Sequence, residues 1–111
     1  MNRVAMSSAA SSLLRALIAR AGVTRERVLL TDVQSIDWRS LTFNGERHLI
    51  ELRVPGPGSR EIVERMCDGL EEAEFSIPGT IVADIAVAGA PRRALDGSIC
   101  LTMEALTVAA D

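Results

Sequence analysis

The chain has 111 residues, of which 48% are hydrophobic and only 3% aromatic, and its formal net charge at pH 7 is −3. This length accommodates one domain, residues 1–111, and the apolar content suffices for a hydrophobic core. Nucleic-acid binding depends on a surplus of basic residues and on aromatic stacking platforms. A mildly acidic chain with few aromatic residues therefore argues against a nucleic-acid partner.

The first predicted element is a helix from Ser8 to Ala21. Gly22 follows it and suits the left-handed residue that ends many helices. Arg15 and Arg20 interrupt the apolar stretch, so we interpret the segment as a helix of a soluble protein and expect no membrane insertion. The apolar residues that recur at helical spacing are Leu13, Leu14, Leu17, Ile18 and Ala21.

A β-hairpin is predicted next, with strands at 28–43 and 46–54. Asn44-Gly45 lies between them and is the dipeptide most typical of a tight hairpin turn. The first strand is long, so we expect a bend or bulge between Ser35 and Arg39.

A second helix is predicted after the sequence PGPG at 55–58, which ends the strand. Ser59 is the expected N-cap. The apolar face of this helix comprises Ile62, Val63, Met66, Cys67, Leu70 and Ala73. Its outer face carries Glu64, Asp68, Glu71, Glu72 and Glu74. We favour a solvated face for these acids over a face that meets arginines from another element or a partner.

Two further strands complete the chain. The sequence TIVADIAVAGA at 80–90 alternates, which places Ile81, Ala83, Ile85 and Val87 on one side. A turn at 91–97 leads to the last strand, where Ile99, Leu101 and Met103 share a side.

The order α-β-β-α-β-β predicts an α+β fold. We expect a two-layer sandwich in which two helices cover one face of a four-stranded antiparallel sheet. This order is a circular permutation of the ferredoxin-like β-α-β-β-α-β arrangement.

His48, the one histidine of the chain, is the first candidate for chemistry. It shares strand parity with Ile50 and Leu52, so it extends the apolar side of the strand. A two-residue loop places it opposite Leu41, and a three-residue loop places it opposite Ser40. We interpret His48 as a packing residue bonded to a hydroxyl or carbonyl group. On this interpretation its pKa lies below 6.5, and His48→Leu keeps or improves stability.

The alternative for His48 is a catalytic or ligand-binding role. If a bulge turns Asp37 toward the ring, an Asp–His pair forms beside Arg39. The protein would then be a small enzyme or a small-molecule binder with its site near the hairpin tip. Because the chain has no nucleophile motif such as G-x-S-x-G, we rank this alternative second.

The sequence predicts neither a metal site nor a cofactor. Cys67 and Cys100 are isolated and form no C-x-x-C motif, so we expect two thiols in a reducing cytoplasm. Arg92 and Arg93 lie side by side and could hold a carboxylate or phosphate together. A solvated turn is the favoured interpretation of this pair.

The side of the sheet that faces away from the helices suggests an interface. Leu49, Val82, Leu106 and Val108 are expected there beside charged residues. A mixed face of this kind suits packing against a second subunit or another protein. The leading hypothesis is therefore a non-enzymatic interaction domain that forms a homo-oligomer.

Overall fold

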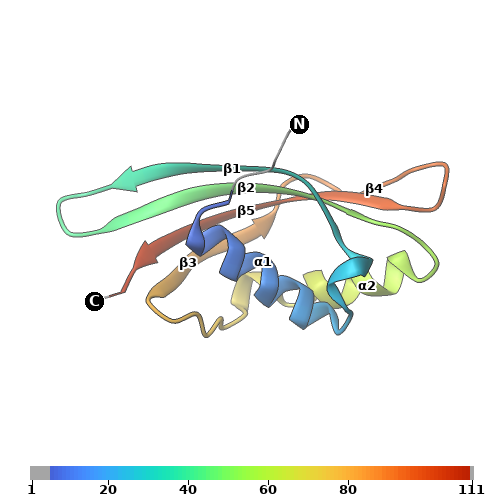
Figure 1. Ribbon diagram of the computed structural model, residues 1–111, viewed down its shortest axis with the longest axis horizontal. Helices are drawn as coiled ribbons and strands as arrows, with labels where there is room; N and C mark the ends of the chain where they lie inside the picture. Colours follow the sequence, from blue (N-terminus) through green and yellow to red (C-terminus); the bar gives the residue numbers. More distant parts are fainter. Residues whose placement is uncertain (1–5, 111) are drawn as a thin grey trace.

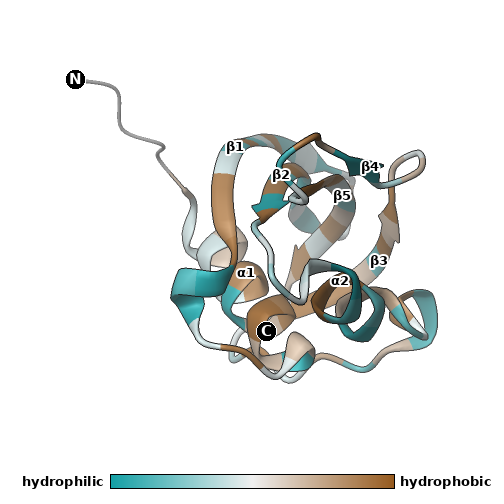
Figure 2. Ribbon diagram, turned by 90° about the vertical axis from the view of Figure 1, so that its right-hand side faces the viewer, coloured by the Kyte–Doolittle hydropathy of each residue, from teal (hydrophilic) through white to brown (hydrophobic). Residues whose placement is uncertain are grey.

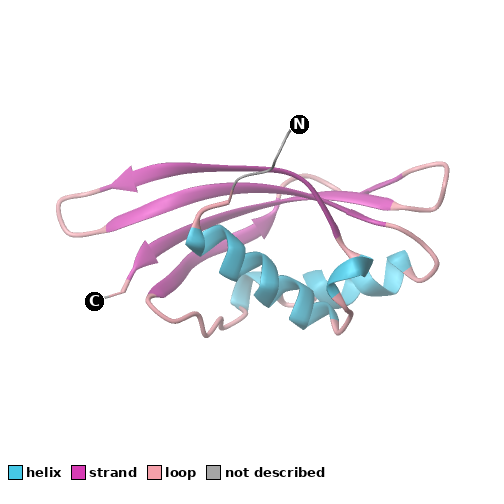
Figure 3. Cartoon of the chain, viewed as in Figure 1, coloured by secondary structure: helices cyan, strands magenta, loops and turns pink. Residues whose placement is uncertain are grey.

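The computed structural model describes residues 6–110. It is an α+β fold with two helices and a five-stranded antiparallel sheet. Both helices lie on the same face of the sheet (Figures 1 and 3). The strand order is β1-β2-β5-β3, and the short β4 pairs with β5. The elements are α1 (Ser8–Ala21), β1 (Leu29–Arg39), β2 (Asn44–Val54), α2 (Ser59–Cys67), β3 (Thr80–Val87), β4 (Arg92–Arg93) and β5 (Ile99–Ala109).

Helix α1 confirms the prediction for residues 8–21. The side chain of Ser7 caps its start by accepting a hydrogen bond of 3.2 Å from the N–H of Ala10. Gly22 ends it with φ of 71°, and its N–H donates to the carbonyl of Ala19. Both ends of the helix are set by local sequence. The first end needs a side-chain oxygen that accepts a hydrogen bond, and the last end needs a residue that tolerates the left-handed region.

The turn of the β1–β2 hairpin differs from the prediction. The loop is Ser40–Phe43, and Asn44-Gly45 belongs to β2. The N–H of Ser40 donates to the carbonyl of Phe43 at 2.9 Å, and the Ser40 hydroxyl accepts from the N–H groups of Thr42 and Phe43. These bonds close a four-residue loop, so the predicted Asn-Gly turn is wrong.

Gly45 has a different role within β2. A Cβ built at this position would overlap the backbone carbonyl of Thr107 and lie 3.1 Å from Cγ1 of Val108. The backbone of β5 therefore approaches β2 here more closely than any side chain permits. The chain uses glycine at this point for close approach and not for a positive φ.

Two bulges set which residues face the helices. In β1 the register shifts at Thr31, between Leu30 and Asp32, and not between Ser35 and Arg39 as predicted. In β3 it shifts at Ala83, between Val82 and Asp84. Each bulge inserts one residue and inverts the alternation on one side of it.

Helix α2 starts and ends differently from the prediction. Gly58 occupies the N-cap position, and Ser59 is the first helical residue. The hydroxyl of Ser59 is buried and donates to the carbonyl of Gly97 at 2.8 Å, so it joins the helix to the β4–β5 turn and does not cap it. The helix ends at Cys67 because Gly69, with φ of 62°, begins a short 3₁₀ turn at 70–72.

Arginine side chains cap the C-terminal ends of the two helices reciprocally. Arg65 of α2 donates from Nε to the carbonyl of Ala21 at 2.8 Å. Arg20 of α1 donates from Nε to the carbonyl of Met66 at 3.1 Å, and also to the carbonyl of Asp68. These carbonyls have no partner within their own helix, so each pairing stabilises both helices at once. The predicted acids on α2 and beyond, Glu64, Asp68, Glu71, Glu72 and Glu74, have exposed side chains.

The core lies between the helix layer and the sheet. Figure 2 shows apolar residues in both layers, with the helices beneath the strands. Fully buried members include Leu13, Leu17, Ile50, Met66 and Met103. The β1–β2 hairpin extends past the N-terminal end of α1, so its tip is not covered by the helices (Figure 1). Within residues 6–110, no helix has the length and apolar character needed to cross a membrane.

Candidate functional site

His48 lies in β2, on the side of the sheet that faces the helices, and only 3% of it is exposed. Its Nδ1 is 2.8 Å from the hydroxyl of Ser35 in β1, and its Nε2 is 2.8 Å from the hydroxyl of Thr107 in β5. A hydroxyl can donate or accept, so the two partners satisfy both nitrogens of a neutral imidazole. The ring therefore joins three neighbouring strands through hydrogen bonds, in an environment that favours its neutral form.

Burial lowers the pKa of His48 below its ordinary value of 6.5, and the negative charge of Glu46 opposes this effect. The unfolded chain consequently takes up a proton on His48 at a higher pH than the folded chain does. Acidification through this interval favours the unfolded state.

Above about pH 6.5, we expect protonation of His48 to have no effect on the free energy of unfolding. Between about pH 6.5 and the lowered pKa of the folded state, the free energy of unfolding should fall as the pH drops. NMR titration of the single histidine should give a midpoint below 6.5. Denaturant unfolding at several pH values should show the corresponding loss, and His48→Gln should abolish that part of the pH dependence. A midpoint above 6.5 would contradict the neutral, buried ring.

The predicted Asp37–His48 pair is not formed. Ser35 occupies the position at Nδ1 that an orienting carboxylate would need, and Asp37 lies opposite Glu46 in the hairpin register. Arg39 lies opposite Asn44, farther along the same strand. The expected bulge that would have turned Asp37 toward the ring is at Thr31 instead. The catalytic alternative therefore loses its geometric basis.

Arg92 and Arg93 form β4, where they pair with Cys100 and Ile99 respectively. Successive residues of a strand point to opposite faces of the sheet. The two guanidinium groups therefore do not converge on one anion, although both are exposed. The sequence predicted a turn at 91–97, but Arg92 and Arg93 pair with β5 as a strand. This pairing directs their two side chains to opposite faces.

The two cysteines lie on different elements: Cys67 ends α2 and Cys100 is in β5. Both are free and half-buried. Burial raises the pKa of the Cys67 thiol, and the charge of Arg20 opposes this effect. Among residues 6–110, the side chains of His, Cys, Asp and Glu do not gather in a group of three that could hold a metal ion.

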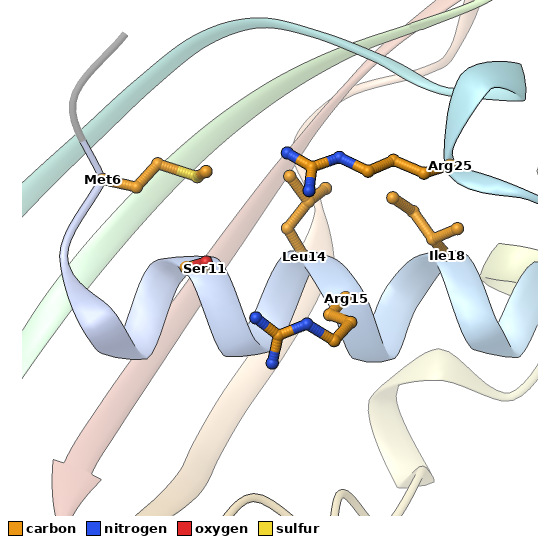
Figure 4. A pocket seen from close by; sticks show the side chains of 6 residues that line it. All are labelled: Met6, Ser11, Leu14, Arg15, Ile18 and Arg25. Atoms are coloured by element: carbon orange, nitrogen blue, oxygen red, sulfur yellow. The ribbon is translucent and has the colours of Figure 1, made fainter.

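A small hollow lies between α1 and the segment that leads into β1 (Figure 4). Its volume is about 70 Å³. Leu14 and Ile18 form its apolar wall, and Arg15 and Arg25 lie beside it. Small-molecule and cofactor sites usually enclose about 300–1,000 Å³. This hollow is too small for such a ligand.

The outer face of the sheet, which points away from the helices, has a more extensive apolar surface. Two aligned rows of cross-strand neighbours run over β1, β2, β5 and β3: Trp38–Gly45–Val108–Ile81, and Ile36–Arg47–Leu106–Asp84. Leu49 and Ala86 follow in the next row. Ile36 is 66% exposed, which is high for a large apolar residue on a sheet.

A hollow of about 260 Å³ lies on this outer face. It brings together side chains from all four long strands, among them Ile36, Arg47, Leu49, Asp84, Glu104 and Leu106. The lining combines apolar groups with both signs of charge. It lies on the open surface of the sheet.

The structure places the predicted interface residues as follows. Leu49 and Leu106 line the hollow on the outer face. Val108 lies on the same face by its register opposite Gly45, but it is buried, with 9% of it exposed. Val82 is not, because the bulge at Ala83 turns it toward the helices, where it packs against the core. Ile81 takes its place on the outer face and is 52% exposed. The sequence interpretation also missed Ile36 and Trp38, whose place in the alternation of β1 depends on the bulge at Thr31.

No protein-family model matches the chain, and no curated protein matches its sequence.

Proposed function

We propose that the protein is a non-enzymatic assembly domain that associates with further copies of itself through the outer face of its sheet. The observation that carries this proposal is the hollow formed by Ile36, Leu49 and Leu106 together with Arg47 and Asp84. A two-fold symmetric interface uses the same patch on both subunits, so it must be complementary to itself. Apolar groups and both signs of charge within one patch meet this requirement.

The surroundings of His48 argue against the alternative function, a small enzyme or a small-molecule-binding protein. A small enzyme or ligand-binding protein with its site at the hairpin tip would need an accessible imidazole near a carboxylate and an arginine. Here both ring nitrogens bond to hydroxyls, and the ring is buried. The outer face then remains the surface best suited to a partner, which is a second copy or another protein.

We also propose that the fold is a permuted ferredoxin-like arrangement. Two observations support this proposal. The long elements follow the order α-β-β-α-β-β, and β2 and β5, the second long strand of each hairpin, are neighbours at the centre of the sheet. Two free cysteines suit a reducing compartment, and we place the protein in the cytoplasm.

Leu106→Arg is expected to dissociate the assembly. The substitution places a charge in the apolar centre of the proposed contact, which should weaken association by about 100-fold or more. Light scattering after size-exclusion chromatography should give a smaller mass for the variant, while its far-ultraviolet circular dichroism stays that of the wild type.

Leu95→Arg is the matched control, because Leu95 is fully exposed in the loop between β4 and β5 and lies outside the hollow. It should leave the mass unchanged. If Leu106→Arg and Leu95→Arg have the same mass as the wild type, the outer face is not the interface.

A further inference from the structure

Strand β1 forms an edge of the sheet. Ten of its 11 residues, all except the bulged Thr31, pair with β2 on one side, and the other side has no strand partner within residues 6–110. Many proteins protect such an edge with a proline, a lysine, a bulge, an inward-pointing charge or a short strand, because its free N–H and C=O groups can pair with another chain. β1 contains neither proline nor lysine, and its bulge at Thr31 leaves residues 32–39 in regular register.

The charges at the end of β1 are unusual. Asp37 and Arg39 flank Trp38, and both are exposed. Among the described residues, neither forms an ion pair. Asp37 lies directly opposite Glu46 in the hairpin, and like charges in that relation destabilise a sheet. A cation placed on the free side of Asp37 would relieve this repulsion.

We propose that β1 pairs in antiparallel fashion with β1 of a second copy, about a two-fold axis at Trp38. In such a pairing, residues at equal distances before and after Trp38 lie opposite each other across the axis. Asp37 then lies opposite Arg39 of the partner subunit, and Arg39 lies opposite Asp37 of the partner subunit. In each copy, Arg39 of the partner subunit thus places a positive charge beside Asp37 and Glu46.

The apolar groups of the hairpin agree with this register. The two Trp38 side chains lie opposite each other on the outer face, an arrangement in which aromatic pairs stabilise contacts. Ile36 lies opposite Ser40 of the partner subunit, at the start of that copy's loop. Because β1 ends at Arg39 and residues 40–43 form the hairpin loop, residues 37–39 are the strand segment that pairs in both copies. This register thus combines charge complementarity with an aromatic pair at the two-fold axis.

Charge reversal at the two positions tests the register. Asp37→Arg alone places arginine opposite arginine, and Arg39→Asp alone places aspartate opposite aspartate. Each single variant should weaken dimerisation about tenfold or more, since two attractive pairs become repulsive. An equimolar mixture of the two single variants should form a heterodimer, because every pair across the axis is then of opposite sign. The double variant should dimerise like the wild type.

Sedimentation velocity and native mass spectrometry can measure these states, with circular dichroism as the check on folding. The pairing is overturned if either single variant dimerises as the wild type does, or if the mixture gives no heterodimer. Asp37 and Arg39 belong to the helix-facing side of β1, so their reversal leaves the outer-face hollow unchanged. If only Leu106→Arg loses association, self-association through the outer face is supported and pairing along β1 is overturned. If only the charge variants lose association, pairing along β1 is supported and self-association through the outer face is overturned.

Discussion

Gly45→Ala will destabilise the fold by roughly 3 kcal/mol, because the added methyl group has no space. It would overlap the carbonyl oxygen of Thr107 and crowd Val108, so β2 and β5 must move apart at this point. Proteins of this size are stable by only about 5–15 kcal/mol, so the loss is a large fraction of the total. Urea unfolding, followed by the fluorescence of the single tryptophan, measures it directly.

Gly89→Ala separates this steric effect from the ordinary cost of replacing glycine. Gly89 has φ of 74°, and a Cβ built there meets no atom within 4 Å. Its replacement should therefore cost only about 1–2 kcal/mol, from the left-handed conformation alone. If Gly45→Ala is no more harmful than Gly89→Ala, the close approach of the two strands is not as the structure describes it.

His48→Leu is the second substitution for which a large effect is expected. The sequence alone led us to expect unchanged or improved stability, whereas the two hydroxyl contacts of the ring lead us to expect a loss. Thr107 is 2% exposed, and its hydroxyl bonds to the ring, as does that of Ser35. Leucine leaves both hydroxyls without that partner, which should cost about 2–3 kcal/mol, most of it from Thr107.

The second substitution Thr107→Val distinguishes a lost hydrogen bond from poor packing. Added to His48→Leu, it removes the buried hydroxyl that has lost its partner and should recover more than half of the stability. Thr107→Val alone should destabilise, because it leaves the imidazole Nε2 without a partner. Equal stability of wild type and His48→Leu in urea would show that the hydroxyl contacts contribute little.

The elements that the sequence predicted well depend on local signals. The apolar spacing of α1, the residue Gly22 and the alternation of β2 are all properties of neighbouring residues. The parity of β2 correctly placed His48 on the side that faces the helices. These signals do not require knowledge of what the rest of the chain contacts.

The features that the sequence did not predict depend on contacts between distant segments. Ser40 closes a longer loop than the Asn-Gly pair suggested, which shifts the register by several residues and brings Ser35, in place of Leu41 or Ser40, opposite His48. The bulge at Ala83 leaves no mark in the alternation, so Val82 and Ile81 were assigned to the wrong faces. The partners of His48 and the composition of the outer face both followed from these shifts.

The central claim is that this chain assembles with copies of itself. Sedimentation equilibrium of the wild-type protein, from low to high micromolar concentration, tests it most directly. We predict a mass that rises to at least twice that of one chain over this range. The mass of a single chain at every concentration would contradict both self-association through the outer face and pairing along β1.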